Sequence, residues 1–191
     1  MKKLFILFTT LVLTLSSVTF AMTPTYTNDA KFNRGVGNCC YYVDGSASGY
    51  ANQISSAANN WEVTGYGWNP IYMTEVSSNY ATHMDFYSAT PATDGYLSNS
   101  TLGYTTFWNS NSTLVTPKTN YPTYDYFYTE IIFNNTANNS YDYRTAKHEM
   151  GHAFGLAHYA NHYSIMYPDY SGMYVSTVQQ CDHDTINYLY N

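Results

Sequence analysis

Residues 148–158 read His-Glu-Met-Gly-His-Ala-Phe-Gly-Leu-Ala-His. His148 and His152 are four residues apart, so on a helix both imidazoles leave the same face about one turn apart. Gly155 lets the chain leave that helix sharply, because glycine tolerates left-handed backbone angles. The turn can then bring His158 back to the same place. The spacing therefore predicts three imidazoles that converge on one metal ion.

Three imidazole nitrogens suit a tetrahedral zinc ion, at roughly 2.0–2.1 Å from each nitrogen. Three protein ligands leave the fourth position for water, which is the arrangement of a catalytic site and not of a structural one. Glu149 lies beside His148 and can act as a general base without binding the metal. The sequence thus predicts one catalytic zinc held by three histidines. Calcium is a possible second ion, but no residue pattern supports it.

The segment resembles the zinc-binding consensus of the metzincin peptidases. Met166, within Ser-Ile-Met-Tyr-Pro at 164–168, resembles the Met-turn of that clan. The Met-Tyr-Pro form is similar to the matrixins, the family of the matrix metalloproteinases and their bacterial relatives. Astacins and serralysins place a tyrosine two residues after the methionine, where this chain has Pro168. The resemblance implies a zinc endopeptidase that hydrolyses peptide bonds of extracellular proteins with a metal-activated water.

The same resemblance implies where a substrate lies. Leu102, Gly103 and Tyr104 are similar to the start of the matrixin edge strand, along which a substrate backbone would bind. Tyr167 and Pro168 would wall the pocket that receives the side chain after the cleaved bond. Packing roles for both of these residues remain open.

Other histidines are interpreted as bystanders. Vertebrate matrixins carry histidines and an aspartate for a second, structural zinc in the loop before the edge strand, and this chain lacks them there. His83 and Asp85 are interpreted as a solvated strand face. His162 and His183 are interpreted as bystanders because His158 already fits the place of the third ligand.

The expected fold is α+β (mixed α/β), a metzincin-like single catalytic domain. It would contain a twisted, mostly parallel sheet with an antiparallel edge strand, an active-site helix and a C-terminal helix. Apolar spacing and turn signals predict the elements. Strands are expected at 40–43, 71–76, 82–87, 102–108 and 126–133, and helices at 46–61, 143–156 and 182–190, the last with Asp182 as its N-cap.

The N-terminus has the features of a secretory signal peptide, over residues 1–21. Met1-Lys2-Lys3 is basic, the run from Leu4 to Leu15 is almost wholly apolar, and Thr19-Phe20-Ala21 has small residues where signal peptidase reads. Residues 22–38 are predicted to be a loose leader, and residues 39–191 the peptidase domain. The predicted location is therefore extracellular, by secretion.

Three cysteines are expected to form one disulfide in an exported protein. Cys39 and Cys40 are neighbours, whose side chains point apart, so Cys181 would pair with one of them. Sequence leaves open which one. A cysteine that caps zinc in a zymogen is a further alternative.

The amino-acid composition indicates which classes of binding partner to expect. Only 10% of residues are charged and the net charge is −6, which indicates neither a nucleic-acid partner nor an anionic membrane surface. A protein or peptide substrate and a monomeric state are expected. The alternatives are a secreted non-catalytic binding module for carbohydrate or cell-wall material with a structural zinc, and a metal hydrolase that acts on a non-peptide bond.

Overall fold

The computed structural model describes residues 27, 29–115, 121–137 and 142–191. Five strands form one sheet in the order β2-β1-β3-β5-β4. Neighbouring strands are parallel, except that β4 pairs with β5 in the antiparallel sense at the edge. The elements are β1 (Cys39–Val43), the 3-10 helix η1 (Gly45–Tyr50), α1 (Ala51–Glu62), β2 (Met73–Val76), β3 (Met84–Ala89), β4 (Gly103–Trp108), β5 (Tyr128–Asn134), α2 (Tyr143–Ala153), the 3-10 helix η2 (Tyr170–Gly172) and α3 (Gln180–Tyr190). The predicted mixed α/β architecture, with a mostly parallel sheet and an antiparallel edge strand, is confirmed.

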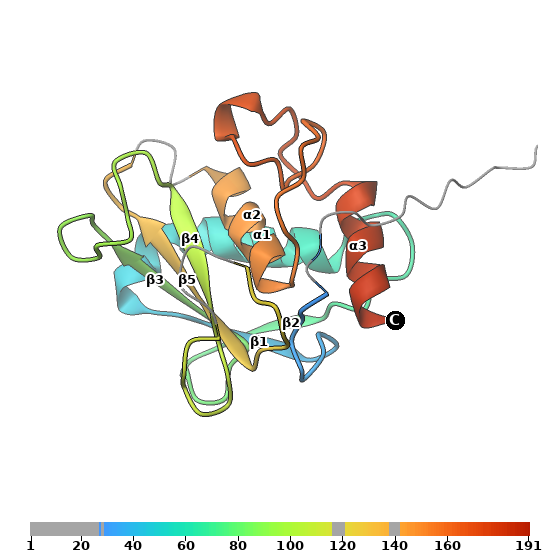
Figure 1. The fold of residues 1–191 in the computed structure, drawn as a ribbon, viewed down its shortest axis with the longest axis horizontal. Helices are drawn as coiled ribbons and strands as arrows, with labels where there is room; N and C mark the ends of the chain where they lie inside the picture. Colours follow the sequence, from blue (N-terminus) through green and yellow to red (C-terminus); the bar gives the residue numbers. More distant parts are fainter. Residues whose placement is uncertain (1–26, 28, 116–120, 138–141) are drawn as a thin grey trace, which may run out of the picture.

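Helices α1 and α2 pack together against one face of the sheet, and α3 lies beyond one end of them (Figure 1). Trp61 of α1 is fully buried, and its indole N–H donates to the carbonyl of Lys147 on α2, at 2.9 Å. This bond matters because a buried indole without a partner would be costly. The contact fixes α2, and with it the predicted metal ligands, against the first helix.

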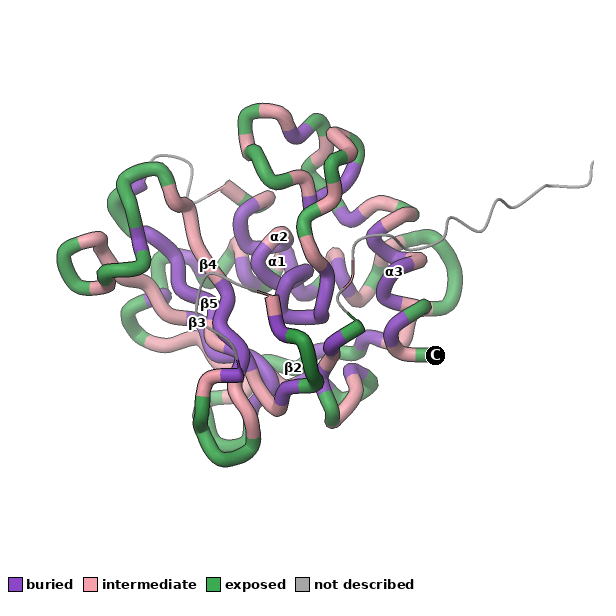
Figure 2. Tube along the Cα trace, in the orientation of Figure 1, coloured by how far each residue is buried: buried purple, intermediate pink, exposed green. Residues whose placement is uncertain are grey.

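The buried residues gather between the sheet and these two helices (Figure 2). Strands β3 and β5 contribute Phe86, Ile131 and Phe133, each with no exposed surface. Ile131 and Phe133 are two residues apart, so both face the same side of β5. Burying each such side chain contributes roughly 1.5–3 kcal/mol. The core therefore holds β5 and its edge partner β4 firmly beside α2.

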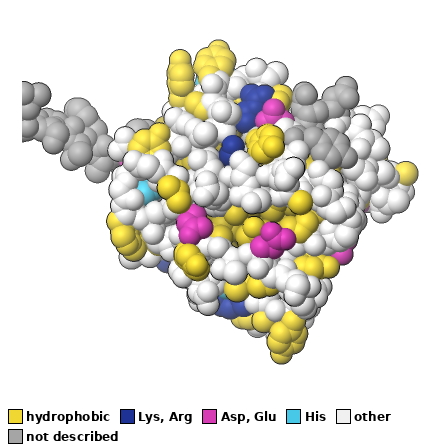
Figure 3. Space-filling model, turned by 180° about the vertical axis from the view of Figure 1, so that it is seen from behind, with side chains coloured by type: hydrophobic (Ala, Val, Ile, Leu, Met, Phe, Trp, Pro, Cys, Tyr) yellow, Lys and Arg dark blue, Asp and Glu magenta, His cyan; other side chains and the backbone are white. Residues whose placement is uncertain are grey.

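Charged groups are sparse on the surface. Seen from behind, acidic and basic side chains are few and scattered among uncharged ones (Figure 3). Among the described residues, none of the helices combines the length and the apolar character needed to cross a bilayer.

The prediction of a loose leader at 22–38 is wrong for the part that the structure describes. Ala30, Phe32 and Val36 are each at most 2% exposed and belong to the core. The backbone of Asn33 donates to the carbonyl of Tyr126 at 2.9 Å. These three apolar residues are separated by polar ones and show neither a helical nor a strand period, so the sequence did not indicate that they are buried. The predicted signal peptide, residues 1–21, lies outside the described residues.

The prediction that Asp182 is the N-cap of the last helix is wrong. Helix α3 begins at Gln180, and the carboxylate of Asp182 accepts from the backbone N–H of Gln179 at 2.8 Å. The same side chain accepts from the hydroxyl of Ser164 at 2.6 Å and from the N–H of Ile165 at 3.2 Å. Asp182 therefore ties the start of α3 to the loop that carries Met166.

The predicted disulfide is also wrong, since none of the three cysteines is in a disulfide in the structure. Cys39 is fully buried in the core, on the inward face of β1. Cys181 lies in the first turn of α3, and Cys40 is partly exposed. Burial raises the pKa of the Cys39 thiol, which keeps it in the unreactive protonated form.

Candidate metal centre

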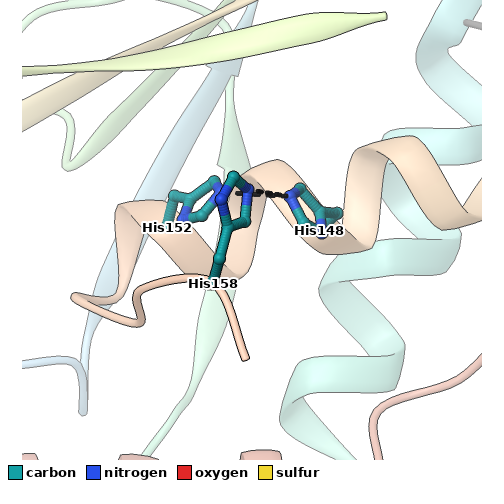
Figure 4. Close-up of side chains that lie close together, drawn as sticks. All are labelled: His148, His152 and His158. Carbon is teal, nitrogen blue, oxygen red and sulfur yellow. Dashed lines mark hydrogen bonds between the residues drawn. The ribbon is translucent and has the colours of Figure 1, made fainter. Parts of the chain in front are cut away.

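The three predicted ligands converge on one point. His148 and His152 project from the same face of α2, and His158 returns from the loop that follows (Figure 4). The Nε2 atom of His148 is 3.0 Å from that of His152 and 3.2 Å from that of His158. One nitrogen from each ring lies within 4.8 Å of the other two. Bonds of about 2.0–2.1 Å to a tetrahedral zinc would place nitrogens roughly 3.3 Å apart, so the group has the size of a zinc site.

Backbone carbonyls hold the outer nitrogens of two rings. The Nδ1 of His148 lies 2.8 Å from the carbonyl oxygen of Ile165, and the Nδ1 of His152 lies 2.8 Å from that of Leu156. A carbonyl only accepts, so both Nδ1 atoms must carry the proton. In neutral rings each Nε2 then presents a lone pair. Two lone pairs 3.0 Å apart repel each other unless a cation lies between them, so the residues fit a metal ion.

Burial favours the neutral, ligating form of all three rings. It lowers the pKa of His148 to about 4 and that of His152 well below its usual value. It also lowers the pKa of His158, which is more exposed than the other two. Near pH 7 the three rings are therefore neutral, as metal binding requires.

Gly155 provides the turn that the sequence predicts. Its φ is +99°, a value that side-chain-bearing residues rarely adopt. A Cβ at this position would lie 2.4 Å from the carbonyl oxygen of Ala30. The hydroxyl of Tyr126 donates to the carbonyl of Ala153, the last residue of α2, and that of Tyr190 donates to the carbonyl of the next residue, Phe154. The end of the helix is thus packed closely, with no room for any residue but glycine.

Glu149 lies beside the ligands with its side chain toward β4. Glu149 is only 6% exposed, and the hydroxyl of Thr105 donates to its Oε2 at 2.9 Å. Burial raises the pKa of Glu149 to about 7, although the bond from Thr105 lowers it. A carboxylate with a pKa near neutrality can both accept and release a proton at physiological pH. Sequence reasoning had identified Glu149 but had missed Thr105.

Met166 lies directly under α2. It is fully buried, and a Cβ added to Gly151 would fall 2.2 Å from its sulfur. The carbonyl of Met166 accepts from the N–H of Tyr159 at 2.9 Å. This contact joins the loop of His158 to the turn of Met166. The position matches the one that the resemblance implied for a Met-turn.

A cleft of about 710 Å³ runs past the histidines. The predicted substrate residues Leu102, Gly103, Tyr104, Tyr167 and Pro168 all line it. The structure adds Arg144, at the start of α2, whose guanidinium lies 3.9 Å from the ring centroid of Tyr170 and pairs with Asp142 at 3.0 Å. The cleft therefore joins the metal centre to the edge of the sheet on one side and to the loop at 167–173 on the other.

Comparison with known families agrees with this geometry. Residues 128–191 match the family model of the matrixins. This match covers the last third of the chain, includes the three histidines, Glu149 and Met166, and supports a matrixin-like relative of the metzincins. No curated protein matches the chain.

Tyr121 is a further residue of the candidate metal centre, which the sequence did not predict. Its ring centroid lies 5.3 Å from that of His152 and 5.8 Å from that of His158. Its hydroxyl accepts from the backbone N–H of His158 at 3.1 Å. Tyr121 therefore packs against two candidate ligands and also holds the backbone of one of them, His158. Nothing distinguished it in a sequence with 23 tyrosines.

His83 and Asp85 are buried, contrary to the interpretation as a solvated strand face. They are 6% and 5% exposed. The N–H of Cys40 donates to Nδ1 of His83 at 3.2 Å, and the hydroxyl of Thr82 donates to Asp85 at 2.6 Å. Among the described residues, they join no group of three potential metal ligands. His162 and His183 also lie outside such a group among the described residues. The ring of His162 stacks on Tyr174, and His183 is hydrogen-bonded to Thr64.

Burial of Asp85 predicts a stabilising substitution. Desolvation raises the pKa of this carboxyl to about 6, from 3.8. The folded state then retains a proton that the unfolded chain loses, so the free energy of unfolding falls as pH rises from about 4 through 6. Asp85→Asn, which keeps the acceptor for Thr82, should raise that free energy at pH 7 by on the order of 1 kcal/mol, after allowance for partial solvent screening.

Urea denaturation at pH 7 and at pH 3.5 checks this expectation, because the gain should vanish at the lower pH. The matched control is Asp44→Asn. The backbone N–H of Ser46 lowers the pKa of Asp44, so its replacement should give no gain at pH 7. An Asp85→Asn protein no more stable than the wild type at pH 7 would contradict the prediction.

Proposed function

We propose that this chain is a secreted zinc endopeptidase that hydrolyses peptide bonds of extracellular proteins. The observation that carries the proposal is the convergence of three Nε2 atoms beside a buried carboxylate, in a cleft along a sheet edge. The matrixin match supports a zinc metallopeptidase. Secretion rests on the predicted signal peptide at residues 1–21.

His148, His152 and His158 would hold the zinc. When bound, the ion would supply a Lewis acid that polarises a carbonyl and lowers the pKa of a water molecule. Glu149 would accept the proton from the attacking water as its oxygen bonds to the peptide carbon. As the carbon–nitrogen bond breaks, Glu149 would return that proton to the leaving amine. One carboxylate thus serves both proton transfers.

Thr105 would position this base. Its hydroxyl lies 2.9 Å from Oε2 of Glu149 and 3.1 Å from the backbone oxygen of the same residue. One carboxylate oxygen is therefore anchored to β4. The other oxygen is then left for the reacting water.

Thr105→Val should lower kcat about 5- to 10-fold, because it removes one hydrogen bond of about 1 kcal/mol while preserving shape. KM and zinc content should stay near wild type, since the backbone and the histidines are unchanged. Thr105→Ser, which restores the hydroxyl, should recover most of the loss. Steady-state kinetics on a fluorogenic peptide separates kcat from KM. A Val variant with wild-type kcat, or a Ser variant as slow as Val, would refute the positioning role.

Casein digestion tests the whole proposal. The mature protein should cleave casein, lose activity with a chelator and regain it with zinc, and elemental analysis should find one tight zinc per chain. Mass spectrometry of the products would give the residue preference. If folded, zinc-loaded protein cleaves neither casein nor a peptide library, the peptidase proposal is wrong and the non-catalytic binding module is favoured.

A further inference from the structure

One wall of the cleft is the segment 167–173, which stands beyond α2 and away from the sheet (Figure 1). We call this segment the cleft wall. Tyr167, Pro168 and Met173 are among its residues that line the cleft. The segment contains only the short 3-10 helix η2, so it lacks the hydrogen-bond ladder that fixes a strand or a long helix. Contacts with other parts of the chain must therefore hold it in place.

The first of these contacts comes from the start of α2. The hydroxyl of Tyr170 donates to Oδ2 of Asp142 at 2.6 Å, and Nη1 of Arg144 donates to the carbonyl of Met173 at 3.3 Å. These two bonds hold the middle and the end of the cleft wall. Neither of them involves Tyr167, at its beginning.

His162, interpreted from the sequence as a bystander, makes the second contact. Its Nδ1 lies 2.5 Å from the carbonyl oxygen of Gly172, and because a carbonyl only accepts, Nδ1 is the donor. The carbonyl of His162 in turn accepts from the N–H of Tyr174 at 2.8 Å. The side chain and the backbone of His162 are therefore both bonded at the end of the cleft wall.

The ring of His162 also lies between two tyrosine rings. Its centroid is 4.2 Å from that of Tyr167, at an interplanar angle of 33°, and 4.8 Å from that of Tyr174, at 18°. Two rings this near and this nearly parallel cannot share one face of an imidazole, so they pack on opposite faces. A Cβ on Gly172 would lie 2.6 Å from Cε1 of Tyr167. The ring of Tyr167 is thus in close contact with both His162 and Gly172, which leaves it little space to move.

We propose that His162 is a positioning residue, which fixes the ring of Tyr167 and so sets the size of the pocket for the substrate side chain after the cleaved bond. This inference rests on the proposed peptidase function. Among the described residues, His162 belongs to no group of three potential metal ligands, so it acts through Tyr167 and not through the metal. A pocket selects by size only when its walls keep their positions, and residues behind a wall provide that rigidity.

His162→Ala tests this role, because it removes both the stacked ring and the donor to Gly172. The measurement is kcat/KM for peptides that differ only in the residue after the cleaved bond, which is alanine, valine, leucine or phenylalanine in turn. A fitted apolar pocket separates side chains that differ by one methylene by about 10- to 200-fold. In the variant, the ratio between the best and the poorest of these peptides should fall about 5-fold or more, because Tyr167 is no longer held. The zinc content should equal that of the wild type.

His183→Ala is the matched control, because His183 is a buried histidine that bonds Thr64 and does not line the cleft. It should leave the ratio unchanged even if it lowers the stability. An equal loss of kcat/KM for all peptides in His162→Ala would overturn the proposal, since a merely structural role predicts that result. So would a wild-type protein that cleaves all four peptides equally well. If the wild type cleaves none of them, the proposed function itself is contradicted.

Gly172→Ala tests the same ring independently, and it decides the question if His162→Ala does not fold. Gly172 has no positive φ, so an alanine meets no backbone strain there, but its Cβ would displace the ring of Tyr167. The ratio should then change by about 3-fold or more. Gly45→Ala, where a Cβ meets nothing within 4 Å, should keep the wild-type ratio. A folded Gly172→Ala protein with the wild-type ratio would overturn the proposal.

Discussion

Replacing Glu149 by glutamine should abolish peptide hydrolysis while the protein keeps its zinc. Glutamine has nearly the same shape and can still accept from Thr105, but it cannot take a proton from water. General base catalysis contributes about 10²–10⁴-fold, so kcat should fall by about 10³-fold or more when both proton transfers are lost. The three histidines are untouched, so zinc binding should persist.

The measurement pairs fluorogenic peptide turnover with elemental analysis of zinc on the same sample. Glu75→Gln is the matched control, because Glu75 is exposed on β2, at the opposite edge of the sheet from β4. It should retain wild-type turnover. Substantial hydrolysis by a zinc-loaded Glu149→Gln protein would remove Glu149 from the role of base. Loss of zinc in that variant would place Glu149 among the ligands instead.

The candidate site could be predicted from the sequence to the extent that it is local. His148, Glu149 and His152 lie within two turns of one helix, where residue spacing alone fixes which side chains share a face. His158 could be added because Gly155 marks the turn. The structure places all four where that reasoning expects them.

Contacts between distant segments could not be predicted in this way. Thr105 is 44 residues from Glu149 along the chain, and Tyr121 is 37 from His158. Which hydroxyl reaches the site depends on the register of β4 against β5 and on how α2 packs over both. No single-sequence pattern carries that information. Arg144 was missed for a different reason. It lies next to Asp142, the N-cap of α2, and in the sequence such a charged pair is typical of an ordinary helix start.

The fold shows the same division. Strands and helices with clear apolar periods were predicted close to their observed bounds. The errors fell on groups whose environment is tertiary. Phe32 lies in a polar stretch but fills the core, Cys39 faces inward where we had expected a disulfide partner, and Asp182 bonds the Met166 loop as well as its own helix. Each depends on which distant element lies opposite.

Gly155→Ala should weaken zinc binding about 10- to 100-fold and reduce hydrolysis in proportion at limiting zinc. At φ +99° an alanine is strained, and its Cβ would stand 2.4 Å from the backbone oxygen of Ala30. Strain of this kind costs about 1–3 kcal/mol. Without metal, the loop can relax by moving His158 away. To bind zinc, His158 must return to the strained position, so the strain energy reduces the free energy of zinc binding. Each 1.4 kcal/mol of strain weakens the zinc affinity about tenfold.

Competition with a chromophoric chelator measures the affinity, and thermal unfolding of the metal-free protein shows whether the loop has relaxed. Gly95→Ala is the control, because a Cβ there meets nothing within 4 Å. If relaxation occurs, the metal-free variant should melt near the wild-type temperature while its zinc affinity drops. A lower melting temperature with unchanged affinity would mean that the strain stays in both states. The third ligand would then be held by Tyr121 and Tyr159 rather than by the turn itself.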